Sequence, residues 1–153
     1  MKKILITGSN GFIARNIAAR LTDCEITLTN RSNLNPLIAS DVDKFFKDKY
    51  FDVVLHTAIK GGTRLAEDEA EFVYQNCLMH FNILRNQNSF GRYISFGSGA
   101  ELDRALNINE LSSYETSLPT DPYGMSKILI ARSGEKFEKF YNIRIFNIFN
   151  EDE

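Results

Sequence analysis

The chain has 153 residues, of which 43% are hydrophobic and 25% are charged, and its formal net charge is −2. This length suits one domain with a sizeable core, and the balanced charge offers no basic surface for nucleic acid. No apolar run approaches the roughly 20 residues that cross a membrane. Its 2 cysteines lack metal-type spacing and indicate buried thiols of a reducing compartment. We therefore expect a cytoplasmic protein with no metal, nucleic-acid or membrane partner.

Short apolar runs and helical patterns alternate along the chain. The expected strands are 2–7, 25–29, 52–58, 92–98 and 143–149. The expected helices are 14–21, 41–49, 67–87 and 123–141, with a polar irregular segment over 100–121. This alternation predicts an α/β fold with a doubly wound parallel sheet and right-handed crossovers. No internal repeat or linker divides it, so residues 1–150 are predicted to form one domain.

A glycine turn separates the first expected strand from the first expected helix, in the stretch TGSNGFIA (7–14). Gly8 permits a tight turn, Gly11 lets the backbone approach a pyrophosphate, and the helix N-terminus favours the negative charge. Ala14 stands where a third glycine often lies. A turn that serves only packing is the alternative, but strand, turn and helix occur in the order that a dinucleotide site requires. The residues predicted to bind cofactor here are Gly8, Asn10, Gly11, Phe12 and Ile13.

The end of the second expected strand bears on the choice of cofactor. A carboxylate there would bind the adenosine ribose of NAD. The sequence instead reads TNRSN (29–33), in which Arg31 could pair with a 2′-phosphate while Asn30 and Ser32 add hydrogen bonds. An arginine that is simply solvated is the alternative. The segment favours NADP, with NAD as the second choice.

Several further motifs follow in order along the chain. HTA (56–58) follows the middle strand, Asn76 lies in the long helix, Ser98 follows the next strand, and YGMSK (123–127) begins the last helix. Together with the glycine turn, these motifs resemble the extended short-chain dehydrogenase/reductase family from residue 1 to about 150. Its members have a Rossmann-type sheet and act mainly on nucleotide sugars. Within the family, Arg31, AIKGG (58–62) and FVYQN (72–76) are similar to segments of GDP-L-fucose synthases.

The resemblance implies roles for individual residues. Tyr123 would be the general acid that protonates a keto-sugar oxygen, and Lys127 would lower the tyrosine pKa from about 10 and hold the nicotinamide ribose. Their four-residue spacing places both side chains on one helix face. Ser98 would bind the substrate oxygen, and Asn76 would order the lysine or a water. Thr57 and Ala58 would line the cofactor groove.

The sequence departs from relatives at two positions after Ser98. The fucose synthases have a proton-transferring cysteine where this chain has Ala100, and the 4,6-dehydratases have an Asp-Glu pair where it has Gly99 and Ala100. Epimerisation at C3 and C5, and dehydration, are therefore disfavoured. Reduction of a 4-keto sugar, or epimerisation at C4, remains.

Family members usually have about twice this length, and the second half builds most of their sugar site. Residues 151–153 are thus expected to begin a substrate region that is otherwise missing. Two functions stay open. One is NADP-dependent reduction or epimerisation of a 4-keto-6-deoxy nucleotide sugar for surface polysaccharides, and the other is a non-catalytic dinucleotide-binding regulator or partner subunit. Many members pair through two helices, so the resemblance favours a homodimer through 67–87 and 123–141.

The two histidines belong to none of these motifs. His56 ends a strand and His80 lies on the long helix. Since neither has a partner motif, we interpret both as structural residues rather than ligands.

Overall fold

The computed structural model describes residues 1–63, 66–102 and 118–148. Within these residues, five parallel strands form one sheet in the order β2-β1-β3-β4-β5. The strands are β1 (Lys2–Thr7), β2 (Cys24–Thr29), β3 (Phe51–His56), β4 (Phe90–Ser98) and β5 (Phe140–Ile145). The helices are α1 (Phe12–Arg20), α2 (Ala39–Phe46), α3 (Glu71–Leu84) and α4 (Pro122–Gly134), with 3₁₀ turns η1 (Gln87–Ser89) and η2 (Gly99–Glu101). The predicted Rossmann-type doubly wound parallel sheet is confirmed.

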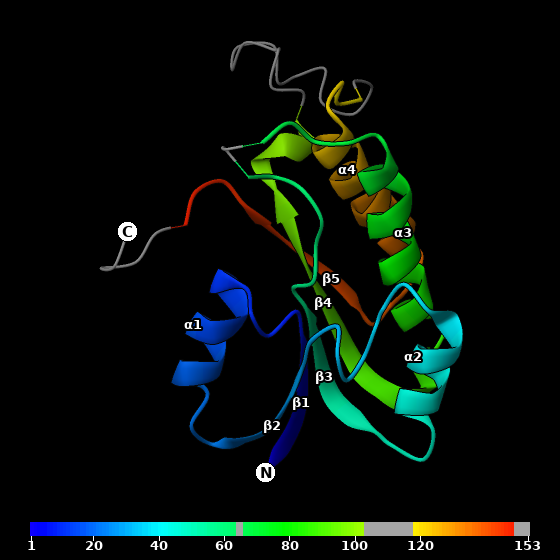
Figure 1. Ribbon diagram of the computed structural model, residues 1–153. Coiled ribbons are helices and arrows are strands. Elements are labelled where there is room, and N and C mark those ends of the chain that lie inside the picture. The colour runs from blue at the N-terminus through cyan, green and yellow to red at the C-terminus, as the bar shows by residue number, and fades with distance from the viewer. Residues whose placement is uncertain (64–65, 103–117, 149–153) are drawn as a thin grey trace.

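Helices cover both faces of the sheet, with α1 on one side and α2, α3 and α4 on the other (Figure 1). Successive side chains of a strand point to opposite faces. In β1, Ile4 and Ile6 join the cluster under α1, while Leu5 joins the cluster under α2 and α3. Both clusters are apolar, which explains why the strands read as nearly continuous hydrophobic runs.

The order of the strands places the candidate residues at one edge of the sheet. β2 and β3 lie on opposite sides of β1, so the chain changes direction across the sheet at β1. Ligands of open parallel sheets bind in the crevice beyond the carboxyl ends of the strands at such a point. Gly8, Asn30, Thr57 and Gly99 follow the carboxyl ends of β1 to β4 in turn.

The long helix is shorter than the expected 67–87, because residues at both ends make other contacts. Before α3, the Asp68 carboxylate accepts a hydrogen bond from the Gly62 N–H at 2.7 Å. After α3, the Asn86 side chain donates to the Asn82 carbonyl at 3.1 Å and to the Asp43 carboxylate at 3.0 Å. The prediction of a helix was correct, and its ends were wrong by three or four residues.

The last helix and strand also differ from the expected 123–141 and 143–149. α4 ends at Gly134, and the Phe140 ring fills the space that a side chain at residue 134 would need. Phe140 then packs against Tyr93 with ring centroids 5.6 Å apart, and it begins β5. Residues 103–117 of the expected irregular segment, residue 149 and residues 151–153 lie outside the described residues.

Over the described ranges 1–63, 66–102 and 118–148, no helix is both long enough and apolar enough to cross a membrane. The same ranges contain no group of three or more histidine, cysteine or acidic side chains placed to hold a metal ion. Cys24 and Cys77 are free thiols.

Candidate functional site

The glycine turn after β1 has the geometry of a phosphate-binding turn. Gly8 has a φ of +69°, and a Cβ there would lie 2.8 Å from the backbone of Ala58, so glycine is required both for the conformation and for the space. Its carbonyl accepts the Gly11 N–H at 2.9 Å. Gly11 is the N-cap of α1 and has no side chain to cap the helix. The first N–H groups of α1 can therefore bind an anion.

The ends of β1 and β3 are joined beside this turn. The Thr57 hydroxyl donates to the Thr7 carbonyl at 2.6 Å, and the Thr7 hydroxyl lies 2.8 Å from Nδ1 of His56. His56 is buried, and its pKa is lowered to about 3, first by desolvation and then by electrostatic interaction with His80 and Lys127. A neutral His56 thus helps to fix the floor of the crevice.

The segment after β2 folds into a compact turn that presents Arg31. The Asn30 side-chain oxygen accepts from the Ser32 N–H at 2.9 Å and from the Ser32 hydroxyl at 2.6 Å. The Asn33 side-chain oxygen accepts the Asn30 N–H at 2.8 Å. Asn30 and Ser32 therefore shape the turn, and Arg31, at its exposed tip, lines the neighbouring cavity.

This cavity of about 280 Å³ lies between the ends of β1, β2 and β3. It brings together Gly8, Asn10, Gly11, Asn30, Arg31, Thr57 and Ala58, seven of the residues expected to bind cofactor. Asn35, Pro36, Leu37, Ile59, Lys60 and Met79 also line it, and their contribution was not predicted. Phe12 lies at the start of α1, where its carbonyl accepts from the Asn16 side chain at 3.0 Å.

Tyr123 lies in the first turn of α4 because the sequence DPYG starts a helix at that point. The Asp121 carboxylate accepts the Gly124 N–H at 2.7 Å as an N-cap, and Pro122 takes the first helical position. On its other side, the Tyr123 ring contacts the loop after β3. Gly62 has a φ of +76°, and a Cβ there would lie 2.5 Å from the ring. Gly62 thus allows this loop to pack directly on the tyrosine.

Lys127 is 7% exposed, although its ammonium is charged at neutral pH. Its Nζ donates to the Phe96 carbonyl at 2.5 Å and lies 5.4 Å from the centroid of the Tyr123 ring. Burial lowers the lysine pKa to about 8, and the Glu101 carboxylate opposes that shift. The predicted pair is therefore brought together, with a cation that is held at a fixed point beside the tyrosine.

Ser98 and Asn76 hold the loops around this pair. Ser98 is the N-cap of η2, and its hydroxyl accepts the Ala100 N–H at 3.1 Å. Asn76 is 1% exposed and binds both backbone groups of Lys60, at 2.8 and 3.0 Å, and donates to the Ser126 hydroxyl at 3.0 Å. These bonds connect Asn76 to the loop after β3 and to α4, and none of them reaches the Lys127 amine, one of the two groups, with a water, that it was expected to order.

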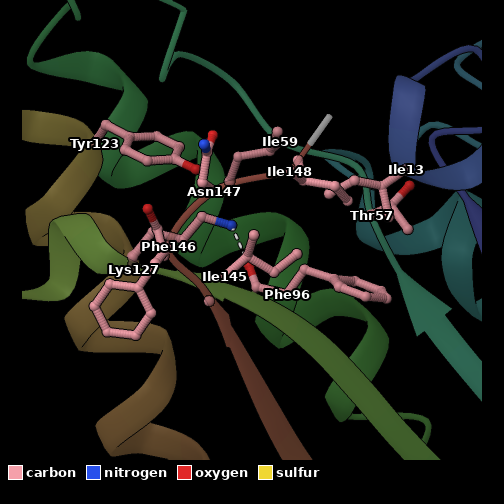
Figure 2. A pocket seen from close by; sticks show the side chains of 12 residues that line it. Ile13, Thr57, Ile59, Phe96, Tyr123, Lys127, Ile145, Phe146, Asn147 and Ile148 are labelled. Carbon is pink, nitrogen blue, oxygen red and sulfur yellow. Dashed lines mark hydrogen bonds between the residues drawn. The ribbon is translucent and has the colours of Figure 1, made fainter. Parts of the chain in front are cut away.

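A second cavity of about 660 Å³ contains the tyrosine and the lysine. Ser98, Tyr123, Lys127 and Ile13 line it, together with Phe96, Gly97, Ile145, Phe146, Asn147 and Ile148. Figure 2 shows Tyr123 and Lys127 extending from α4 into this space, with the lysine amine at the Phe96 carbonyl. Thr57 and Ile59 line this cavity and the cavity near Arg31 alike, so the two form neighbouring parts of one crevice.

This crevice can perform a particular chemistry. Its first part offers backbone N–H groups and a cation, as a dinucleotide phosphate requires. Its second part offers a phenol and a hydroxyl beside a buried ammonium, which suits proton transfer to an oxygen. Sequence reasoning missed Lys60 and Gly62 as site residues. The Gly61–Gly62 pair, in the AIKGG stretch, was the signal that a loop approaches another chain segment closely.

Comparison with known proteins is consistent with this geometry. A GDP-L-fucose synthase from Sinorhizobium fredii is 32% identical over 104 residues, which are 65% of this chain and 31% of that protein. A GDP-D-glycero-L-gluco-heptose synthase from Campylobacter jejuni, solved in the presence of NADPH, has a TM-score of 0.80 at 22% identity, over 97% of this chain and 48% of that one. A GDP-mannoheptose C4 reductase from the same organism, with NADP bound, has a TM-score of 0.78 at 24% identity, over 97% and 52%.

The chain thus spans about half the length of the solved structures that it resembles. The predicted similarity to GDP-L-fucose synthases and related nucleotide-sugar enzymes is confirmed as a similarity. Residues 4–151 match the model of one protein family along nearly the whole chain. The chain belongs to the NAD-dependent epimerase/dehydratase family.

Proposed function

We propose that the chain carries the cofactor site and the proton-transfer residues of an NADP-dependent nucleotide-sugar reductase or C4 epimerase. The observation that supports it best is the single crevice with Arg31 at one end and Ser98, Tyr123 and Lys127 at the other. This arrangement pairs a binding region for a phosphorylated dinucleotide with a proton donor. Its substrate would be a 4-keto-6-deoxy nucleotide sugar, a precursor of surface polysaccharides.

The residues present fit NADP. A Cβ at Gly8 would fill the space where the turn closes on Ala58, and the uncapped start of α1 points N–H groups toward the crevice. Arg31 supplies the positive charge that a 2′-phosphate requires, where an NAD-specific site would hold a carboxylate. Thr57 lines both cavities, and Ile13 lines the cavity that holds Tyr123. NAD remains the second choice.

The chain's own residues would supply the proton. A bound NADPH would supply the hydride. The Tyr123 hydroxyl would donate its proton to the sugar oxygen, and Ser98 would hold that oxygen by a hydrogen bond. The Lys127 ammonium, fixed at the Phe96 carbonyl, would stabilise the phenolate that forms. Solvent would return the proton to Tyr123, so a ketone, NADPH and one proton give an alcohol and NADP⁺.

Two observations support a simple reduction, or a C4 inversion, over chemistry at C3 and C5. Ala100 follows Ser98 by two residues, and its methyl side chain has no ionisable group that could transfer a proton. Among the similar proteins is a GDP-mannoheptose C4 reductase with NADP bound.

The free thiols of Cys24 and Cys77 fit a reducing compartment such as the cytoplasm.

A homodimer through α3 and α4 is part of the proposal. Tyr74 and Phe81 on α3 are 65% and 48% exposed, and Leu129 on α4 is 43% exposed. Exposed apolar side chains on two adjacent helices fit an interface between two copies. Sedimentation of the wild type and of Phe81→Glu would measure this, since a buried glutamate should separate the two copies.

Hydride transfer to a panel of 4-keto sugar nucleotides tests the function. The assay follows NADPH oxidation by the chain and, if the reading frame continues, by the longer product. Tyr123→Phe should abolish turnover and leave NADP affinity unchanged, and Tyr50→Phe, at an exposed tyrosine before β3, is the matched control. Cofactor binding without turnover, together with an unaltered biological activity of Tyr123→Phe, would instead support a non-catalytic dinucleotide-binding module.

A further inference from the structure

Glu101 is the last residue of η2, and its side chain is fully buried. Four donors meet its carboxylate. Oε1 accepts the Ser98 N–H at 3.0 Å and the Asn142 side-chain amide at 3.1 Å. Oε2 accepts Nε and Nη2 of Arg144, both at 2.8 Å. A buried carboxylate with this many partners is costly to disturb, because removing one partner leaves a charge without compensation.

The surrounding backbone is shaped to admit this carboxylate. A Cβ at Gly97 would overlap Oε1 of Glu101 and would lie 2.6 Å from the Asn142 amide nitrogen. Any larger residue at position 97 would therefore have to displace the carboxylate from its partners. Gly97 itself lines the cavity that holds the tyrosine and the lysine, so the carboxylate lies directly behind the wall of that cavity.

Glu101 connects three parts of the site. Its bond to the Ser98 N–H completes a capping box around η2, which fixes the backbone of the candidate oxygen-binding serine. Its bonds to Asn142 and Arg144 attach η2 to β5. The next residue back, Ala100, packs its carbonyl against Gly124, the neighbour of Tyr123, where no side chain would fit. Displacement of η2 would thus move Ser98 and the start of α4 together.

An electrostatic interaction connects Glu101 to a fourth part of the site, the Lys127 ammonium. The Glu101 carboxylate raises the pKa of Lys127 against the larger effect of burial. Among the residues that the structure describes, the other titratable groups near Lys127 are Tyr123 on its own helix and His56 on β3, and Arg144 pairs with Glu101 itself. Of these groups, Glu101 supplies the negative charge.

We propose that Glu101 is a positioning residue of the Ser98–Tyr123–Lys127 site, whose buried carboxylate holds the Ser98 turn on β5 and supplies a negative charge to Lys127. It does not touch the reacting atoms, and it acts through the serine backbone and the lysine ammonium. The catalytic importance of this role rests on the proposed function. The two physical effects, the hold on the Ser98 backbone and the negative charge beside Lys127, exist in the chain without any sugar.

The test compares Glu101→Gln, which removes the charge, with Glu101→Asp, which keeps the charge but shortens the side chain by one methylene. Two properties are measured by NMR in the chain with NADP added: the titration midpoint of the Lys127 amine from its ¹³Cε shift, and the exchange rate of the Ser98 amide. Glu135→Gln is the matched control, because Glu135 follows α4 with its side chain 61% exposed.

In Glu101→Gln the Lys127 midpoint should fall by about one unit, as loss of a nearby opposite charge requires. In Glu101→Asp the midpoint should stay near the wild-type value, while exchange of the Ser98 amide rises about tenfold because the carboxylate no longer reaches it. Glu135→Gln should change neither property. A folded Glu101→Gln protein with an unchanged midpoint, or a Glu101→Asp protein with unchanged exchange, would reduce Glu101 to a packing residue and overturn the proposal.

Glu101→Gln replaces the buried carboxylate that faces Arg144 with a neutral amide, so the variant could unfold. Glu101→Gln combined with Arg144→Gln removes both charges and keeps a neutral pair, and the Lys127 midpoint should fall by less than in Glu101→Gln alone, because loss of the arginine charge offsets part of the loss of the carboxylate. Turnover gives a separate result. If the midpoint shifts while no keto sugar nucleotide is reduced, the positioning role holds and the proposed function fails.

Discussion

The two ends of the crevice are built in different ways. The end near Arg31 consists of three loops that follow β1, β2 and β3, and backbone groups and short polar side chains form it. The end near Tyr123 is formed by α4, β4, β5 and the loop after β3, and its lining consists of long or buried side chains. The first end depends on local turns, whereas the second depends on how distant elements pack. Changes at the two ends should therefore separate binding from turnover.

A buried histidine lies beneath one element of each end, the glycine turn at the first and α4 at the second. His56 contacts Thr7 beneath the glycine turn at 2.8 Å. His80 lies under α4, where Nε2 is 3.0 Å from the Ser133 hydroxyl and Nδ1 is 3.1 Å from the Tyr93 hydroxyl. Both are buried and neutral, because desolvation lowers the pKa of His56 to about 3 and that of His80 to about 4. Both histidines thus have buried polar partners, which fits the structural role that the sequence indicated.

The largest expected effect is at the tyrosine end. Lys127→Met removes the buried ammonium and should lower turnover about 10³-fold, within the range of general acid–base contributions. The wild-type rate should also fall as the pH rises through about 8, because the amine loses its proton there. The measurement is the pH dependence of NADPH oxidation. Lys136→Met, at an exposed lysine just beyond α4, is the control and should match the wild type at every pH.

The second expected effect is a loss of folding stability at acid pH, and it arises from His56 and His80. Their folded pKa values lie below the unfolded value of 6.5, so the unfolded chain binds more protons below that pH. The contribution of the two neutral histidines to the free energy of unfolding is fully present above about pH 6.5. It is lost as the pH falls toward 4, by about 2 kcal/mol per histidine near pH 5. Urea unfolding across this range measures the loss.

His80→Gln provides the comparison for that experiment. Glutamine can still donate to or accept from a neighbouring hydroxyl but does not titrate, so the free energy of unfolding should depend less steeply on pH. An unchanged slope in His80→Gln would remove His80 from the acid response. His56→Gln should act in the same direction at the other end of the crevice.

The difference between the two ends also explains what could be predicted from the sequence. The glycine turn, Arg31 and the Tyr123–Lys127 spacing are local patterns, and the structure brings them to one crevice, while their roles stay predictions. Gly62 and Glu101 were missed because their roles depend on tertiary contacts across 61 residues and within a buried cluster. The end of α4 at Gly134 was missed for the same reason, since it depends on where Phe140 packs.

A third effect tests the cofactor end alone. Gly8→Ala places a Cβ 2.8 Å from the Ala58 backbone and forces a φ of +69° on alanine. Strain of this kind costs on the order of 1–3 kcal/mol. The free turn would relieve it by moving away from Ala58, and binding would have to restore the strained turn, so NADP affinity should fall about 30-fold. Calorimetry measures the affinity, and the melting temperature shows whether the fold persists. A folded Gly8→Ala protein that binds NADP as tightly as the wild type would contradict the phosphate-binding role of this turn.

The smallest effect concerns the choice between the two cofactors. Arg31 lies in a turn that Asn30 and Ser32 stabilise through each other, so Arg31→Ala should remove a charge without unfolding the turn. A charge-assisted bond to a 2′-phosphate is about twice as strong as a neutral one, and its loss should lower NADP affinity about tenfold while NAD affinity stays unchanged. The ratio of the two dissociation constants is the measured quantity. Arg20→Ala, on α1, removes an equal charge from the far end of that helix and should leave the ratio as it is. An equal loss for both cofactors would place Arg31 at the pyrophosphate rather than at the ribose.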